Sequence, residues 1–240
     1  MTIYILIPVY NESQNINALH ENLMSSLTNE ENFYIFVDDK STDNTVEKLR
    51  STFQGKNHHI IEKTKNQGPG HSFNIGFEWI IDHSKNDNDI IITMEADNTS
   101  DTGILHDMYT ISKLGYDLVL ASVYAQGGGF EKTTLFRKII SFMVNMLFRS
   151  IYNIKVLTLS SFYRIYHISL IEKIKANYPV IISEKGFICM LEILMKAIKQ
   201  QAKIIEVPMI LKWKNRKGKS KMKIIETTIS YLRFLLFKKL

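Results

Sequence analysis

Hydrophobic and polar residues follow a regular order along the first half of the chain. Short apolar runs predict buried strands over 3–9, 33–37, 59–63, 89–94 and 117–122. Each of the first four is followed by a segment in which apolar residues recur every three or four positions, as on one face of a helix. Strands that alternate with helices predict an α/β fold, in which a mostly parallel sheet is covered by helices on both faces.

The second half of the chain is less regular. Three consecutive glycines, 127–129, indicate a flexible turn, and the segment 134–152 is apolar on nearly all sides. The pattern then predicts a helix over 186–200, a strand over 203–211 and a terminal amphipathic helix over 223–237. The sheet is therefore expected mainly in the first half, with amphipathic helices towards the C-terminus.

Composition and charge narrow the class of protein. Hydrophobic residues make up 45% of the 240 positions, which is enough for a sizeable core, and the net charge of +6 indicates an anionic partner. The basic excess is concentrated in 212–223, which holds seven Lys and Arg residues and no acid. The single cysteine, Cys189, excludes a disulfide framework and a zinc site, and its apolar surroundings predict a packed core thiol.

The chain start and its apolar runs bear on membrane insertion. The first residues lack the basic region of a signal peptide and are expected to form a buried strand. No uncharged run reaches the roughly 18 residues that a membrane span needs, so the sequence predicts no spanning helix.

Two of the predicted strands end in pairs of acids. The strand over 33–37 is followed by Asp38 and Asp39, and the strand over 89–94 is followed by Glu95 and Asp97. Ligands of parallel α/β sheets bind beyond the carboxyl ends of the strands. One pair is suited to a base or ribose, and the other to a divalent metal with a diphosphate. Alternatively, the residues after Asp97 only turn the chain, and Asp101 caps the next helix.

A glycine turn lies between the third strand and its helix. Gly68-Pro69-Gly70 lacks the spacing of a dinucleotide-binding fingerprint and follows the third strand of the chain. A Rossmann dehydrogenase is therefore a poor fit, and a tight turn before a helix is the simpler interpretation.

Four motifs, taken in their order along the chain, resemble those of family-two inverting glycosyltransferases, which have the GT-A fold. The motifs are Ile7-Pro8-Val9-Tyr10-Asn11-Glu12, Asp38-Asp39-Lys40-Ser41 with Asp43-Asn44-Thr45, Asn66-x-Gly68-x-Gly70 with Asn74 and Gly76, and Glu95-Ala96-Asp97 at the position of the D-x-D metal motif.

The second half is similar to the dolichol-phosphate mannosyltransferase and polyprenyl-phosphate glucosyltransferase branch of that family. The segments that carry this resemblance are Arg137-Lys138-x-x-Ser141-x-x-x-Asn145, Ser160-Ser161-Phe162-Tyr163-Arg164-Ile165-Tyr166, Ile205-Glu206-Val207-Pro208 and Arg216-x-Gly218-x-Ser220-Lys221-Met222. It implies a catalytic domain over 1–222, with the nucleotide-sugar half ending at about 123 and the acceptor half following. The segment 223–240 would then be a C-terminal amphipathic helix at the membrane.

The resemblance also implies roles for individual residues. The nucleotide-sugar site would be formed by Pro8, Tyr10, Glu12, Asp39, Ser41, Gly70, Glu95, Ala96, Asp97, Arg216 and Lys221. The metal, Mg²⁺ or Mn²⁺, would be held by Glu95 and Asp97, and the acceptor by Arg137, Ser141, Arg164 and Ser220. Asp97, Arg137 and Arg164 would form the catalytic set.

The implied reaction moves a sugar from a GDP- or UDP-linked donor to a polyprenyl phosphate by in-line displacement, with inversion. The second pKa of a phosphate monoester is about 6, so the acceptor is largely dianionic at neutral pH and needs little help from a base. Binding, orientation and charge neutralisation would then supply most of the catalysis.

Two alternatives remain open on the sequence. An enzyme of the same fold that glycosylates a sugar hydroxyl would need a carboxylate base, for which Glu184 and Glu192 are candidates. A degenerate homologue that binds without turnover would explain three departures from the family pattern, namely Glu95 for aspartate, Val123 for arginine and Thr158 for an acid.

The apolar segments 134–152 and 228–240 carry Arg and Lys, which suits an interfacial helix and a buried helix about equally. With the basic terminal residues, this predicts a cytoplasmic protein, peripheral at the inner face of the membrane. Nucleic acid is not an expected partner, because the basic residues are not interleaved with aromatic residues in any RNA-reading motif.

Overall fold

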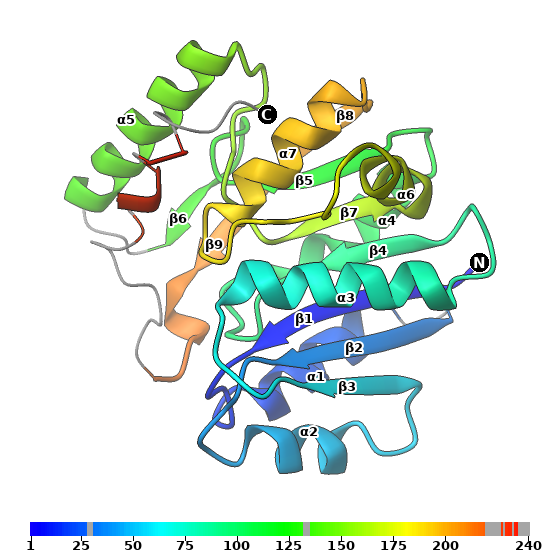
Figure 1. Ribbon diagram of the computed structural model, residues 1–240. Coiled ribbons are helices and arrows are strands. Elements are labelled where there is room, and N and C mark those ends of the chain that lie inside the picture. The colour runs from blue at the N-terminus through cyan, green and yellow to red at the C-terminus, as the bar shows by residue number, and fades with distance from the viewer. Residues whose placement is uncertain (28–30, 132–134, 219–226, 228, 232, 235–240) are drawn as a thin grey trace.

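The computed structural model describes residues 1–27, 31–131, 135–218, 227, 229–231 and 233–234, and its centre is a seven-stranded sheet (Figure 1). Its strands are β1 (Ile3–Val9), β2 (Asn32–Asp38), β3 (His58–Glu62), β4 (Ile90–Thr93), β5 (Leu118–Ser122), β7 (Arg164–His167) and β8 (Ile204–Pro208). Their order across the sheet is β3-β2-β1-β4-β7-β5-β8. Among these strands β7 runs antiparallel to both neighbours, and the other pairs are parallel.

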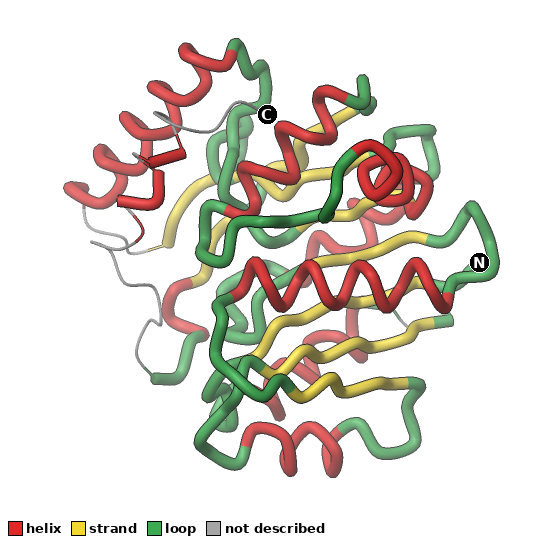
Figure 2. Tube along the Cα trace, in the orientation of Figure 1, coloured by secondary structure: helices red, strands yellow, loops and turns green. Residues whose placement is uncertain are grey.

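Helices cover both faces of the sheet (Figure 2). They are α1 (Ile16–Ser26), α2 (Thr45–Thr52), α3 (Pro69–His83), α4 (Leu105–Ser112), α5 (Leu135–Tyr152), α6 (Ile168–Asn177) and α7 (Cys189–Lys199), with short 3₁₀ turns η1 (Thr102–Ile104) and η2 (Trp213–Asn215). The apolar residues of α1, α2 and α4 pack on one face, and those of α3, α6 and α7 on the other. The mostly parallel α/β architecture predicted from the sequence, with helices on both faces of the sheet, is therefore confirmed.

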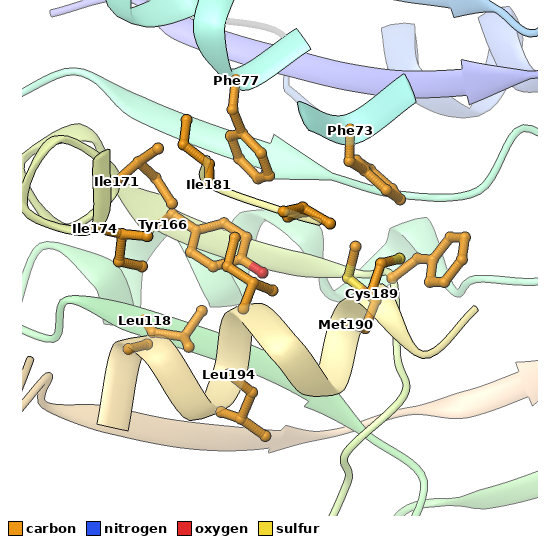
Figure 3. Packing of buried hydrophobic residues seen from close by; sticks show 14 of the residues in the cluster. Phe73, Phe77, Leu118, Tyr166, Ile171, Ile174, Ile181, Cys189, Met190 and Leu194 are labelled. Atoms are coloured by element: carbon orange, nitrogen blue, oxygen red, sulfur yellow. The ribbon is translucent and has the colours of Figure 1, made fainter. Parts of the chain in front are cut away.

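The core between α3, α6, α7 and the sheet is dense in aromatic and branched side chains (Figure 3). Phe73 and Phe77 of α3 face Tyr166 of β7 and Cys189 of α7, all of them almost fully buried. Burial raises the pKa of the Cys189 thiol well above its usual range, so this thiol is a core group, as predicted. Apolar side chains buried to this extent each contribute about 1.5–3 kcal/mol to folding.

A second, two-stranded sheet lies beside the main one. β6 (Gly129–Glu131) pairs in parallel with β9 (Ile210–Lys212), and α5 lies at the periphery of the molecule next to them (Figure 1). Phe148 of α5 is buried against Tyr152 and Tyr231. The small sheet brings the segment after β9 across the carboxyl ends of the main strands.

The predicted elements of the first half are confirmed to within a few residues, but β6, β7 and α6 of the second half were missed. β7 has four residues, two of them polar or charged, and this is too short for a clear alternating pattern. α6 follows it directly. The strand expected over 203–211 is interrupted at Met209 and divides into β8 and β9. The expected terminal helix over 223–237 lies mostly outside the described residues.

Within the described ranges, none of the helices is sufficiently long and apolar to cross a membrane.

Candidate active site

The carboxyl ends of β1, β2 and β4 meet at one edge of the sheet. Val9 pairs with Asp38, and Leu6 pairs with Thr93, so the loops after these strands begin side by side. The Asn11 N–H donates to Ser41 Oγ at 2.9 Å, and the Thr42 N–H donates to Asn11 Oδ1 at 2.7 Å. These bonds join the first and second loops and hold Ser41 next to the loop that follows Pro8 and Tyr10. The nucleotide contacts predicted for these three residues stay predictions.

Asp39 is engaged by the loop that precedes α3. Its carboxylate accepts from Lys63 Nζ at 2.5 Å, from the Gln67 N–H at 2.8 Å and from the Gly68 N–H at 2.7 Å. A carboxylate has about four acceptor positions, so little of Asp39 is left for a base or a ribose. Asp39 therefore stabilises the turn before α3. The contact with a nucleotide predicted for Asp39 stays a prediction.

Asp38 differs from its neighbour. Asp38 Oδ2 accepts from the Ser41 N–H at 3.0 Å, whereas its Oδ1 is buried with no hydrogen-bond partner among the described residues. A buried carboxylate oxygen without a partner costs free energy. Of the two acids after β2, Asp38 therefore has the unused acceptor.

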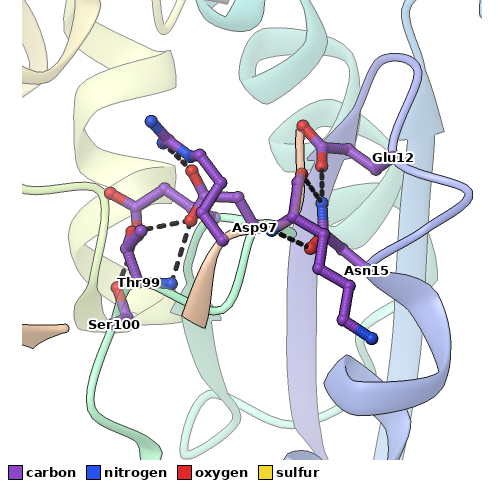
Figure 4. A network of polar contacts seen from close by, with 8 residues as sticks. Glu12, Asn15, Asp97, Thr99 and Ser100 are labelled. Atoms are coloured by element: carbon purple, nitrogen blue, oxygen red, sulfur yellow. Dashed lines mark hydrogen bonds and ion pairs between the residues drawn. The ribbon is translucent and has the colours of Figure 1, made fainter. Parts of the chain in front are cut away.

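Figure 4 shows two neighbouring sets of polar contacts, one around Asp97, Thr99 and Ser100 after β4 and one between Glu12 and Asn15 after β1. Asp97 Oδ1 accepts from the Thr99 N–H at 3.0 Å and from Thr99 Oγ1 at 2.6 Å, and Glu95 Oε2 accepts from Ser100 Oγ at 2.6 Å. These short-range bonds fix both carboxylates just beyond the strand. The expected cap is also confirmed, because Asp101 accepts from the Gly103 N–H at 3.0 Å.

Arg216 inserts its guanidinium among these acids. It forms an ion pair with Asp97 Oδ2 and stacks on the Trp213 ring, with 5.1 Å between the guanidinium carbon and the ring centroid. Burial lowers the pKa of Arg216, while the nearby carboxylates of Glu12 and Glu95 act in the opposite direction. Arginine stays protonated in proteins. The predicted donor residues Glu12, Glu95, Asp97 and Arg216 are thus brought together.

The segment 212–217 is bound at one end to the loop after β4 and at the other to Asn15 after β1. The Lys212 N–H donates to the Thr99 carbonyl at 2.8 Å, and Lys212 Nζ forms an ion pair with Asp101 at 2.9 Å. At the other end, the Asn15 side chain donates to the Lys217 carbonyl at 3.0 Å and accepts from the Lys217 N–H at 2.9 Å. This segment therefore holds Arg216 over the acids.

Arg164, predicted to contact the acceptor, lies in the core instead. Its side chain is 0% exposed. The guanidinium donates to the backbone carbonyls of Ser161 at 2.7 Å, Leu159 at 2.8 Å and Met190 at 2.9 Å. The physical reason is that Arg164 begins β7, between β4 and β5, where a long cation must find its acceptors inside the protein. The structure leaves no part of it free for a substrate.

The other predicted acceptor and phosphate residues have no described side chains. Arg137 and Ser141 lie on α5, one turn apart, but the structure describes only the backbone there. Ser220 and Lys221 lie outside the described residues. Their roles stay predictions.

Gly70 is packed against protein on the side where a Cβ would stand. An added Cβ would come within 2.7 Å of the Cys189 Cβ and even closer to the Glu184 carbonyl oxygen. This close approach requires glycine. In this structure the glycine at position 70 is explained by its close packing against Glu184 and Cys189. The predicted contact of Gly70 with a nucleotide is not needed to explain it.

Glu192, a candidate base for a hydroxyl acceptor, is also used within the protein. It is fully buried, pairs with Lys196 at 2.9 Å, and accepts from the Ser183 hydroxyl and from the Ser183 and Glu184 N–H groups. A fully buried carboxylate that is engaged in this way is not accessible to a substrate hydroxyl. Of the two candidates, the structure leaves Glu184, which is half-buried.

Residues 4–175 match the family model described as Glycosyl transferase family 2. The chain belongs to this family. The motif resemblance is therefore confirmed at the level of the family.

Curated relatives within family 2 extend the comparison. The dolichol-phosphate mannosyltransferase of Pyrococcus furiosus is 28% identical over 98% of this chain and 63% of its own length. The polyprenol monophosphomannose synthase of Mycolicibacterium smegmatis is 24% identical over 85% of this chain and 75% of its own length. The chain thus spans less than two thirds of the Pyrococcus relative.

Solved structures share the fold. Glucosyl-3-phosphoglycerate synthase from Mycobacterium tuberculosis, in complex with Mn²⁺, UDP and glucosyl-3-phosphoglycerate, matches with a TM-score of 0.67 at 13% identity, over 98% of this chain and 79% of that one. S. aureus TarS 1–349 in complex with UDP-GlcNAc matches with a TM-score of 0.60 at 22% identity, over 98% and 65%.

The metal ligands that this family 2 chain offers beyond β4 fit a hard divalent cation. Glu95 and Asp97 supply carboxylate oxygens, the ligands that Mg²⁺ and Mn²⁺ prefer, and substrate phosphates commonly complete such a site. Among the described residues no group of three or more His, Cys, Asp or Glu side chains is arranged to hold a metal. The two carboxylates would therefore hold the cation in combination with phosphate or water, and one of their oxygens, Asp97 Oδ2, is paired with Arg216 in this structure.

Sequence reasoning missed two residues that organise this family 2 site. Asn15 precedes α1, where an asparagine would ordinarily cap the helix, but its side chain makes no cap bond and is used on Lys217 and Glu12 instead. Lys63 is buried beside Asp39 and also donates to Ser72 Oγ at 3.2 Å. Neither residue belongs to a motif. Their partners, Lys217 for Asn15 and Asp39 for Lys63, lie on other segments of the chain, and only the fold determines where those segments lie.

Proposed function

We propose that this chain is the catalytic part of an inverting glycosyltransferase that moves a sugar from a nucleotide diphosphate sugar to a polyprenyl phosphate. The observation that carries the proposal is the arrangement of Glu12, Glu95, Asp97 and Arg216 at the carboxyl ends of β1 and β4. Carboxylates beside a guanidinium suit a donor that has a ribose, a diphosphate and a bound cation. The two curated relatives described above are named dolichol-phosphate mannosyltransferase and polyprenol monophosphomannose synthase, and both names refer to a phosphorylated polyprenol-type lipid.

The donor would lie along the edge formed by the first, second and fourth strands. Pro8, Tyr10 and Ser41 would line the nucleotide end, and Arg216 would bind the diphosphate. A bound Mg²⁺ or Mn²⁺, held by Glu95 and Asp97, would offset the charge that builds up on the departing diphosphate. Either GDP or UDP fits this description.

The acceptor phosphate would approach from the side of α5. Arg137 and Ser141 are one helical turn apart and would bind it together. Because the acceptor brings its own negative charge, no carboxylate base is required, and this agrees with the engagement of Glu192 inside the protein. We therefore favour the lipid phosphate over a sugar hydroxyl as acceptor.

The decisive experiment incubates the purified protein with Mn²⁺ or Mg²⁺, a panel of GDP- and UDP-linked sugars and a short polyprenyl phosphate. A lipid-linked monosaccharide supports the proposal. Release of nucleotide without a lipid product would favour a hydroxyl acceptor, and binding of nucleotide sugar or lipid without any turnover would favour the degenerate homologue.

Substitution of Arg137 by alanine tests the acceptor assignment. The KM for polyprenyl phosphate is expected to rise at least about tenfold, because a charge-assisted hydrogen bond is worth about 1.5–3 kcal/mol. The KM for the nucleotide sugar should change less than about twofold. Steady-state kinetics with each substrate varied in turn measures both constants, and an equal rise in both would contradict an acceptor role.

The exposed face of α5 is a candidate for contact with a membrane surface. Five apolar side chains at helical spacing are about half exposed on it: Phe142, Met143, Met146, Leu147 and Ile151. Phe148 is buried on the inner side of the helix. Such a helix lies in the interface of a bilayer with its apolar face down. We propose that the protein docks there at the inner face of the cytoplasmic membrane, which gives a long lipid access to the site.

The double substitution Met143→Ser with Leu147→Ser is expected to weaken binding to vesicles that contain anionic lipid about tenfold or more, since each side chain loses over 1 kcal/mol of burial. Sedimentation with vesicles measures the partition. The matched control, Leu114→Ser with Val180→Ser, removes two exposed apolar side chains from other elements and should change little. Equal losses in both would contradict docking through α5.

A further inference from the structure

The guanidinium of Arg216 pairs with a carboxylate oxygen that the proposed metal would need as a ligand. Asp97 Oδ1 is already used by Thr99, and Asp97 Oδ2 is paired with Arg216. Both partners are largely buried, with side chains 18% and 8% exposed. An ion pair in such a place is held more strongly than one at the surface, because it is poorly screened by solvent.

Three carboxylates lie around the guanidinium of Arg216. Asp97 pairs with it directly, and the carboxylates of Glu12 and Glu95 are near enough to raise its pKa against the effect of burial. Carboxylate oxygens are also the ligands that Mg²⁺ and Mn²⁺ prefer. One of the two carboxylates proposed to hold the cation is thus engaged by the arginine.

The backbone around Arg216 is fixed independently of this ion pair. Lys217 is bound to Asn15, which is 1% exposed, and Lys212 is bound to Thr99 and Asp101. The guanidinium is at the end of a long side chain, so it can move to a new anion while the segment 212–217 stays in place. The shift needs a change of side-chain rotamer only.

We infer that Arg216 and the divalent cation compete for Asp97, so that the cation binds weakly until a nucleotide diphosphate offers Arg216 another anion. This inference rests on the proposed function and describes how its donor site assembles. When the diphosphate draws the guanidinium away, Asp97 is freed for the cation. By linkage, the cation then raises the affinity for the nucleotide by the same factor. Free metal is thereby kept off the site in the absence of donor.

The test measures Mn²⁺ affinity by electron paramagnetic resonance or calorimetry, first with Mn²⁺ alone and then with UDP or GDP. Substitution Arg216→Gln is expected to tighten Mn²⁺ binding in the absence of nucleotide about tenfold, within the usual range for coupled sites. The tightening caused by nucleotide should be correspondingly smaller than in the wild type. Unchanged or weaker binding of Mn²⁺ alone would overturn the inference.

A control separates competition at Asp97 from a general loss of positive charge. Lys214→Gln removes one charge from the same segment, and Lys214 pairs with Glu131 at 3.2 Å instead of Asp97. It should change the affinity for Mn²⁺ alone less than about twofold, as expected for an exposed charge. An effect equal to that of Arg216→Gln would overturn the inference. If Arg216→Gln does not fold, Arg216→Lys, which keeps the charge but not the planar fork, should give an intermediate affinity.

The outcome is separable from that of the proposed function. Transfer of sugar to polyprenyl phosphate by the wild type, with Mn²⁺ affinity unaffected in Arg216→Gln, overturns this inference alone. Absence of transfer with every donor overturns the proposed function, whereas competition between Arg216 and Mn²⁺ is measured without any turnover.

Discussion

Asp97→Asn is expected to lower kcat/KM for metal-dependent sugar transfer at least about 100-fold, the cost of removing one strong electrostatic contact to a transition state. The asparagine keeps the size of the side chain and can still accept from the Thr99 N–H. It loses the negative charge that would hold the cation and that now pairs with Arg216. The change therefore affects the chemistry and leaves the loop after β4 in place.

Initial rates at increasing Mn²⁺ concentration measure this effect, and circular dichroism establishes that the variant is folded. Asp82→Asn is the matched control, because Asp82 is exposed and pairs with Lys175 at 3.5 Å, away from the crevice. The control should keep at least about half of the wild-type rate. Wild-type activity in Asp97→Asn, with its metal dependence intact, would remove Asp97 from the metal site.

The first half of the chain could be predicted well because its signals are local. Strands such as Ile3–Val9 are continuous apolar runs, and the helices between them have clear spacing. The acids of the site could be predicted for the same reason, since they lie at or just beyond the carboxyl ends of β2 and β4, and parallel strands place those ends at one edge of the sheet. A residue's position along a strand was enough to locate it in the molecule.

The second half could be predicted only in part because its contacts are long-range. β7 is inserted antiparallel between β4 and β5, and no local pattern reveals which strands a four-residue segment will join. The bond between Asn15 and Lys217 joins residues 202 positions apart. Arg164 was assigned to the acceptor because it lies within a familiar motif, and a motif does not show whether its arginine points into a crevice or into the core.

The substitution Arg164→Met is expected to lower the free energy of unfolding by about 2–4 kcal/mol, because it leaves buried carbonyl oxygens without donors. Methionine replaces the unbranched apolar stem of arginine but not its guanidinium group. The carbonyls of Leu159, Ser161 and Met190 lose their partner together. Part of the cost is offset because a charge no longer has to be desolvated.

Urea denaturation measures this loss, and Arg50→Met is its control. Arg50 is 59% exposed and pairs with Glu62 at the surface, so its removal should cost less than about 1 kcal/mol. Folded Arg164→Met should still bind the nucleotide sugar, and its loss of sugar transfer should follow its loss of stability as the temperature rises. If the variant is as stable as the wild type yet transfers no sugar, Arg164 acts on the substrate after all, as the motif predicts. A core role and an acceptor role for this arginine therefore lead to opposite results in the same two measurements.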